Sequence, residues 1–146
     1  MFRSVLVPVD GSEPSLRAVG FALDLVRGAL SCGEHPTVAL LTAVAIPQAL
    51  VLVAGTGEET IDDYVQTTGR ETLAPANALF VEAGIDVTLK IVLGPAFDAI
   101  LHEVKATSPD VVIMGKRGLG ELRGLLLGSV SDRVSHHLQV PVVLVP

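Results

Sequence analysis

Short, continuous runs of apolar residues recur along the chain, and longer stretches with mixed apolar and polar positions separate them. The runs predict strands at about 3–9, 37–46, 86–94, 110–115 and 140–146. They are rich in Val, Leu and Ile, which is typical of parallel strands that are buried on both faces. The stretches between them mostly have helical spacing, so the pattern alternates strand and helix.

The two longest intervening stretches predict helices with recognisable ends. The first helix begins after Ser12, a good N-cap residue, and ends near Ser31, just before Gly33. A second helical pattern covers about 58–83, and Pro75 within it predicts a kink or a break.

Three further stretches are shorter. Helices are expected from Pro95 to Ala106 and from about Ser129 to Leu138. The stretch 47–57 is ambiguous, because its apolar centre fits either a short helical turn or part of a strand. Its flanking proline and glycines favour a loop with local structure.

The alternation of strand and helix predicts one α/β domain over residues 1–146, with a doubly wound, five-stranded parallel sheet and helices on both faces. In such sheets, ligands bind beyond the carboxyl ends of the strands, where the winding reverses. Asp10 and Gly115 both lie at such carboxyl ends of predicted strands. If the first and fourth strands are neighbours, their two loops face each other across one crevice.

Composition and charge narrow the classes of function. The chain has 146 residues, of which 49% are hydrophobic and 3% aromatic, so aliphatic side chains fill the core. A formal net charge of −6 disfavours binding to nucleic acid or to an anionic membrane. The first apolar run is too short for a signal peptide, and no stretch approaches the length of a membrane span. With a single cysteine, Cys32, these features predict a cytoplasmic protein.

The segment Met114–Asp132, MGKRGLGELRGLLLGSVSD, is unusually dense in glycine. Its spacing is Gly115-x2-Gly118-x9-Gly128-Ser, which begins at a strand end and finishes at a helix start. A helix N-terminus binds anions, because its first N–H groups are unpaired and the helix dipole is positive there. The segment therefore predicts a phosphate-binding loop, in which glycine lets the backbone approach the ligand.

Residues around the crevice complete a candidate nucleotide site. Arg117 or Arg123 would offset the remaining phosphate charge, while hydroxyl donors are expected from Ser129 and Ser131. On the opposite wall, Asp10 is placed to accept hydrogen bonds from ribose hydroxyls. The end of the second strand, at Ala43-Val44, supplies an apolar wall for a base.

Simpler interpretations compete with this one. The glycines would then form a mobile surface loop that binds nothing, and Asp10 would be the acid of an ordinary Asp-Gly turn. Ser129 and Ser131 would merely cap their helix, and Met114 would be a core residue. The regular glycine spacing favours the nucleotide site. The segment is not a P-loop, because no Ser or Thr follows Lys116.

The pattern G-x2-G-x9-G-[ST] after an apolar strand is similar to that of the universal stress protein family, in its ATP-binding branch. VLVPVDGSEPSLRA near the start resembles the opening strand, acidic residue and first helix of that family, and DVVIMGKRG…LLLGSVSDRVSHHLQVPVVLVP resembles its closing half. The likeness covers the whole chain, strongly at both ends and weakly across 47–85. It implies the strand order 3-2-1-4-5, ATP or another adenine nucleotide in the crevice, and a homodimer.

Carried over position by position, the resemblance implies a part of the nucleotide for each matching residue. Adenine would lie against Ala43, in a base pocket lined by Pro8 and Val9. Asp10 would hold the ribose, and the sugar side would be lined by Met114 and Gly115. The phosphates would be surrounded by Gly118, Gly128, Ser129, Val130 and Ser131. The small Ala43 departs from the family, where a bulkier aliphatic residue is common. Lys116-Arg117 makes the loop more basic than in many members.

The sequence thus favours a stress-response or signalling protein that binds ATP, with Mg2+ bridging the phosphates without dedicated protein ligands. The alternative is a slow ATPase or a nucleotidyl-transferring enzyme on the same site. It is the weaker hypothesis, because the sequence offers no obvious base to orient a water molecule and no Walker lysine. A third possibility is an interaction module without a nucleotide, and the intact glycines argue against it.

The final run, VPVVLVP at 140–146, is expected at an edge of the sheet. An apolar exposed edge invites pairing with another chain. Antiparallel pairing with the same strand of a second subunit about a two-fold axis would cover it. The alternative is burial beneath a helix of the same subunit. The homodimer is preferred, supported by the family resemblance.

Overall fold

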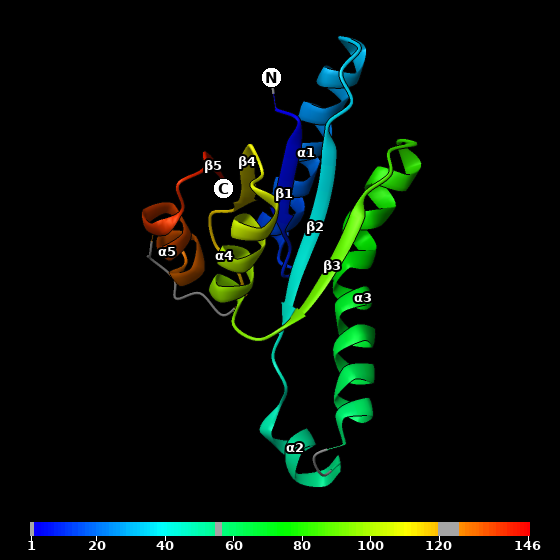
Figure 1. Ribbon diagram of the computed structural model, residues 1–146, viewed down its shortest axis with the longest axis vertical. Coiled ribbons are helices and arrows are strands. Elements are labelled where there is room, and N and C mark those ends of the chain that lie inside the picture. Colours follow the sequence, from blue (N-terminus) through cyan, green and yellow to red (C-terminus); the bar gives the residue numbers. More distant parts are fainter. Residues whose placement is uncertain (1, 55–56, 120–125) are drawn as a thin grey trace.

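The computed structural model describes residues 2–54, 57–119 and 126–146, and its strands form one parallel sheet in the order β3-β2-β1-β4-β5 (Figure 1). The strands are β1 (Ser4–Pro8), β2 (Thr37–Val44), β3 (Thr88–Leu93), β4 (Val111–Gly115) and β5 (Val142–Val145). The helices are α1 (Glu13–Ser31), α2 (Gln48–Ala54), α3 (Glu58–Glu82), α4 (Ala96–Thr107) and α5 (Ser129–His137). The predicted fold class and strand order are confirmed.

Helices cover both faces of the sheet, and side chains that alternate along each strand divide between them. Val5 and Val7 of β1 belong to the core cluster that α1 and α3 cover. Leu6, between them, belongs to the cluster under α4 and α5. All three are at most 1% exposed. A strand buried on both faces explains why the sequence of β1 has no polar alternation.

The helix α3 is a single helix from Glu58 to Glu82, so the predicted break at Pro75 is wrong. The proline ring is exposed, whereas Leu73 and Ala76 on either side of it are completely buried against the sheet. Packing on both sides holds the helix together although proline removes one backbone hydrogen bond. At Gly69, α3 lies so close to β3 that a Cβ atom would overlap the side chain of Ile91.

The ambiguous stretch 47–57 contains the short helix α2, so the helical alternative is correct for Gln48–Ala54. Figure 1 shows that α2 and the first turns of α3 project beyond the carboxyl ends of the strands. Leu52 of α2 is 84% exposed. No helix in the described ranges combines the length and the apolar character that crossing a bilayer requires.

The strand β5 lies at one edge of the sheet, as predicted, and β3 lies at the other. The side chains of β5 are all half-buried. Val143 and Val145 pack against the core under α1 and α3, and Val142 and Leu144 against the core under α4 and α5. Both faces of β5 are therefore partly covered, while β4 is its only strand partner in the described part of the chain.

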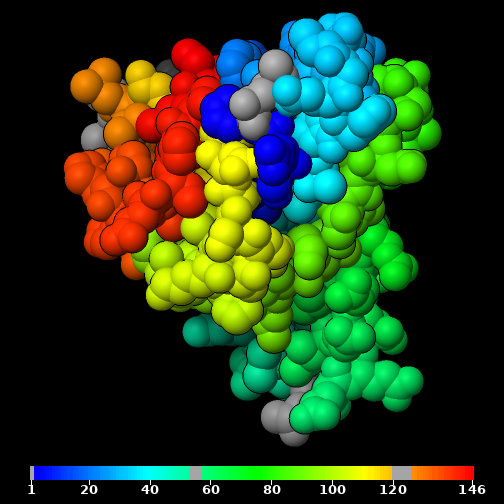
Figure 2. All heavy atoms as spheres, turned by 45° about the horizontal axis from the view of Figure 1, so that its top comes forward, coloured from blue at the N-terminus to red at the C-terminus, as the bar shows by residue number. Residues whose placement is uncertain are grey.

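At the amino end of the sheet, an aspartate joins two neighbouring strands. The carboxylate Oδ2 of Asp110, just before β4, accepts hydrogen bonds from the backbone N–H groups of Arg3 (2.6 Å) and Ser4 (2.9 Å). These two backbone bonds, that from Arg3 first, lower the pKa of Asp110 below its ordinary value. In Figure 2 the N-terminal segment (dark blue) lies between the segments that lead into β4 (yellow) and β2 (cyan).

Candidate functional site

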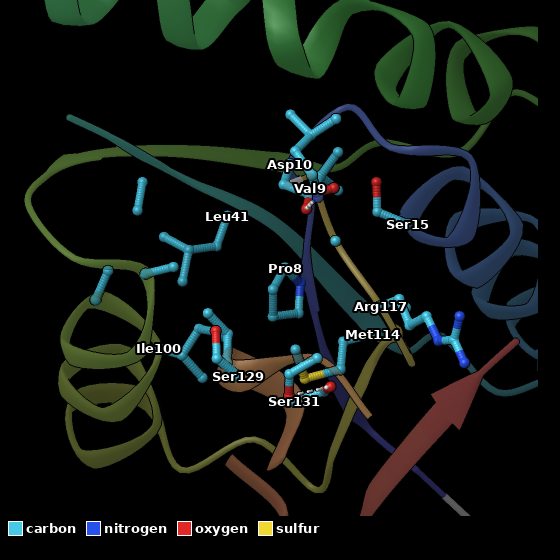
Figure 3. Close-up of a pocket in the computed structure, with 18 residues that line it drawn as sticks. Pro8, Val9, Asp10, Ser15, Leu41, Ile100, Met114, Arg117, Ser129 and Ser131 are labelled. Atoms are coloured by element: carbon cyan, nitrogen blue, oxygen red, sulfur yellow. Dashed lines mark hydrogen bonds between the residues drawn. The ribbon is translucent and has the colours of Figure 1, made fainter. Parts of the chain in front are cut away.

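A pocket opens at the carboxyl ends of the strands, between the loops that follow β1 and β4 (Figure 3). Its volume is about 160 Å³, whereas one water molecule needs roughly 10–15 Å³, so the pocket is too large to be a packing defect. Most residues predicted for the nucleotide site line it: Pro8, Val9, Asp10, Ala43, Met114, Gly115, Arg117, Gly118, Gly128, Ser129, Val130 and Ser131. The structure brings these residues together, and their roles toward a ligand stay predictions. Val44, predicted for the apolar wall beside Ala43, is buried in the core and does not line the pocket.

Asp10 leaves β1 and joins the two loops that form the crevice. Its Oδ1 accepts hydrogen bonds from the backbone N–H (2.9 Å) and the hydroxyl (2.5 Å) of Ser12. Its Oδ2 accepts a hydrogen bond from the backbone N–H of Leu119 (3.0 Å), in the loop after β4. Gly11 between them has φ = +83°, which glycine adopts without strain. Asp10 therefore acts in an Asp-Gly turn and also faces the glycine loop.

Two glycines of the loop allow this close approach. A Cβ atom at Gly118 would overlap the Oδ2 of Asp10. A Cβ atom at Gly115 would lie 2.8 Å from the backbone C of Pro14 and 2.8 Å from the backbone N of Ser15, in the first turn of α1. A side chain at either position would force a neighbour to move: backbone atoms of α1 at Gly115, and the carboxylate of Asp10 at Gly118. The end of β4 thus packs directly against the loop and the helix that follow β1.

The start of α5 is tied to the end of β4 through the peptide groups of Lys116. The carbonyl of Lys116 accepts hydrogen bonds from the backbone N–H of Gly128 (2.9 Å) and from the hydroxyl of Ser131 (2.6 Å). Its N–H donates to the carbonyl of Val145 in β5 (2.6 Å). The N-cap residue is Gly128, which has no side chain to cap the helix, so Ser131 acts as a tether and not as the cap.

The other end of the pocket is apolar. Beside Pro8 and Ala43, the helix α4 contributes Ala96, Ala99 and Ile100, which the sequence analysis missed together with Ser15, Leu41 and Leu119. One feature of the sequence does predict the position of α4. Pro95, two residues after the carboxyl end of β3, is the N-cap of the helix, so α4 starts at the same edge of the sheet as the pocket. Alanines carry no chemical feature that would single them out.

Of the two arginines predicted for the phosphates, only Arg117 lies in the described part of the chain. Figure 3 shows Arg117 at the pocket, with its guanidinium group directed toward α1 and away from Ser129. Arg123, Gly120 and Gly124 lie outside the described residues. Within the described ranges, no group of three or more His, Cys, Asp or Glu side chains is arranged to hold a metal ion.

A family described as the universal stress protein family matches residues 1–146. The universal stress protein YxiE of Bacillus subtilis is 28% identical over 152 aligned positions, which cover 99% of each chain. The solved structure of the hypothetical protein MJ0577 has a TM-score of 0.80 at 23% identity, covering 99% of this chain and 96% of that one. A universal stress protein in complex with cAMP has a TM-score of 0.66 at 26% identity, with 99% and 97% covered.

Proposed function

The chain belongs to the universal stress protein family, and on that premise we propose that it binds an adenine nucleotide, ATP in particular, in the pocket between the β1 and β4 loops. The observation that carries the proposal is the convergence of an acid, a glycine loop and a helix N-terminus on one pocket with an apolar end. Nucleotide occupancy would then serve stress response or signalling by changing the conformation or the partners of the protein.

The pocket suggests how the nucleotide would lie. Its apolar end, between Ala43 and Ile100, suits the flat apolar faces of a base. Asp10 would accept a hydrogen bond from a ribose hydroxyl. The phosphates would lie at the start of α5, near Gly128 and Ser129, where backbone N–H groups and the helix dipole favour anions.

The cAMP complex of a related universal stress protein, 26% identical to this chain, supports adenine as the base. We infer that Mg2+, when present, bridges the phosphates without protein ligands of its own. Binding is favoured over catalysis because Asp10 is the single carboxylate among the described pocket residues, and both of its oxygens already accept protein hydrogen bonds. It is therefore poorly placed to act as a general base for a water molecule.

Calorimetric titration with ATP, AMP and cAMP tests the proposal. We expect saturable binding by the wild-type protein and a loss of at least tenfold in affinity for Gly118→Ala, because the added methyl group overlaps the carboxylate of Asp10. Gly28→Ala is the matched control, because a Cβ atom at Gly28 meets no atom within 4 Å. Absence of binding by the wild-type protein, to all three nucleotides, would refute the proposed function.

We also propose that the protein is a cytoplasmic homodimer that pairs through residues 140–146. Among the described strands β5 pairs with β4 alone, which supports the dimer, since unpaired backbone groups of an edge strand favour pairing with a second copy. Light scattering at increasing concentration is the direct measurement. A mass that stays at one chain would rule out the dimer.

A further inference from the structure

The helices α4 and α5, which form two walls of the pocket, contact each other through an aromatic ring and a cation. The guanidinium carbon of Arg133 in α5 lies 3.9 Å from the centroid of the Phe97 ring in α4. The ring of His137 meets the same ring edge-on, at 5.5 Å between centroids and an interplanar angle of 73°. Phe97 is only 6% exposed, so Arg133 covers a ring that is otherwise in the core.

This contact lies within one helical turn of pocket-lining residues on both helices. On α4, Phe97 lies three residues before Ile100, which lines the pocket. On α5, Arg133 follows Ser129 by four residues and Val130 by three, and residues with these spacings share one face of a helix. Neither Phe97 nor Arg133 lines the pocket itself, so any effect on a ligand must pass through the positions of the helices.

We propose that the Arg133–Phe97 contact is a positioning device that sets the separation of α4 and α5 and thereby lets one ligand touch both walls. The inference rests on the proposed function, in which α4 lines the base end and the start of α5 lies at the phosphates. A nucleotide that spans the pocket gains full affinity from both ends only when the two walls are held at the matching distance.

Arginine suits this position better than other cations. Its planar guanidinium group stacks on an aromatic face and is less strongly hydrated than the ammonium group of lysine. A cation–π contact of this kind is a modest interaction at a partly exposed site, so its removal is expected to loosen the helix pair and not to unfold the domain. The same reasoning predicts that replacing the aromatic ring of Phe97 by an aliphatic side chain also loosens the pair of helices.

The test compares a ligand that spans the pocket with ligands that occupy one end. ATP, adenosine and tripolyphosphate are titrated into wild-type protein, Arg133→Met, Arg133→Lys and Phe97→Leu, with thermal unfolding of each variant as a check of folding. Arg27→Met is the control for loss of one positive charge, since Arg27 is an exposed residue of α1 that lines no part of the pocket. Arg133→Met keeps the length of the side chain and removes the cation.

We expect ATP to bind roughly threefold to tenfold more weakly to Arg133→Met and Phe97→Leu, as loss of one cation–π contact implies. Adenosine and tripolyphosphate should each change less than twofold, Arg133→Lys should recover part of the loss, and Arg27→Met should match the wild type. Unchanged ATP affinity, or an equal loss for ATP and both fragments, would overturn the positioning role while leaving the proposed function intact. Failure of the wild-type protein to bind ATP would instead remove the proposed function, and this inference with it.

Discussion

At each end of the sheet an aspartate carboxylate links the β1 segment to the β4 segment, but the two links have different consequences. At the amino end, Asp110 precedes β4 and accepts backbone N–H groups of the segment that enters β1. At the carboxyl end, Asp10 leaves β1 and accepts a backbone N–H group, that of Leu119, from the segment that leaves β4. In both places the carboxylate bonds backbone next to β1 to backbone next to β4, and these two central strands are neighbours.

The difference lies in the backbone around each carboxylate. Asp110 binds consecutive N–H groups, at Arg3 and Ser4, and so joins two strand ends directly. The bond from Leu119 to Asp10 instead closes a glycine loop over a pocket, which also borders the start of α5. A carboxylate–amide hydrogen bond thus stabilises the fold at the amino end and shapes the proposed binding site at the carboxyl end. Substitutions at each end should therefore affect stability and ligand affinity differently.

The largest effect is expected for Gly115→Ala, which tests whether the carboxyl end is as tightly packed as the amino end. The new Cβ atom would lie 2.8 Å from backbone atoms of Pro14 and Ser15, which cannot rotate away as a side chain can. We expect the free energy of unfolding to fall by about 2–3 kcal/mol, the upper part of the range for overpacking. Urea denaturation measures it.

Gly20→Ala supplies the comparison for that measurement. Gly20 lies in α1, where a Cβ atom meets no neighbour within 4 Å, and alanine favours a helix more than glycine does. This variant should be at least as stable as the wild type. Equal stability of Gly115→Ala and wild type would show that the end of β4 has room to move.

The second prediction is that ATP affinity depends on Asp10 and not on Asp110. Asp10→Asn removes the charge of the carboxylate in the pocket, and we expect ATP affinity to fall about tenfold, because hydrogen bonds to a charged group are the stronger ones. Asp110→Asn makes the same chemical change at the opposite end of the sheet and should leave ATP affinity unchanged. Calorimetric titration of both variants gives the comparison, and equal losses would contradict it.

The smallest effect concerns the pH dependence of stability. The pKa of Asp110 is lowered in the folded protein from an ordinary value of 3.8, so the folded state favours the charged carboxylate. Its stabilising contribution is complete above the unfolded pKa and is lost as the pH falls through the folded pKa. Solvent screening keeps this contribution small, because the group is exposed.

Thermal unfolding of wild type and Asp110→Asn between pH 7 and pH 2 measures this contribution. The wild type should be the more stable protein at pH 7, and the difference should shrink below about pH 3.8. A difference that stays constant across this range would show that the carboxylate charge does not strengthen the bonds to Arg3 and Ser4.

The fold and the polar part of the pocket were predictable because their determinants are local in the sequence. The apolar runs identify the strands, and parallel strands bring their carboxyl ends to one edge. Asp10 follows one such end and Gly115 forms the other, so their proximity depends only on β1 and β4 being neighbours. The N-cap at Ser12 is likewise a local pattern, and its side chain accepts the N–H of Ser15.

The missed features depend on contacts between distant segments. Ala96 and Ala99 line the pocket because α4 packs on the face of the sheet that carries Leu41 of β2, and an alanine in a helix gives no indication of what it faces. Leu119 acts through its backbone N–H, which every residue other than proline possesses. The continuity of α3 through Pro75 depends on packing against the sheet, which outweighs the local tendency of proline to break a helix.

The geometry of Asp10 also limits what the pocket can recognise in a sugar. A carboxylate has about four lone pairs for incoming hydrogens, and Ser12 and Leu119 use three of them. Within the described part of the chain, one lone pair, on Oδ2, receives no protein donor. Under the proposed function, Asp10 would therefore contact a single hydroxyl of the ribose and distinguish it from deoxyribose only if that hydroxyl is the 2′ one.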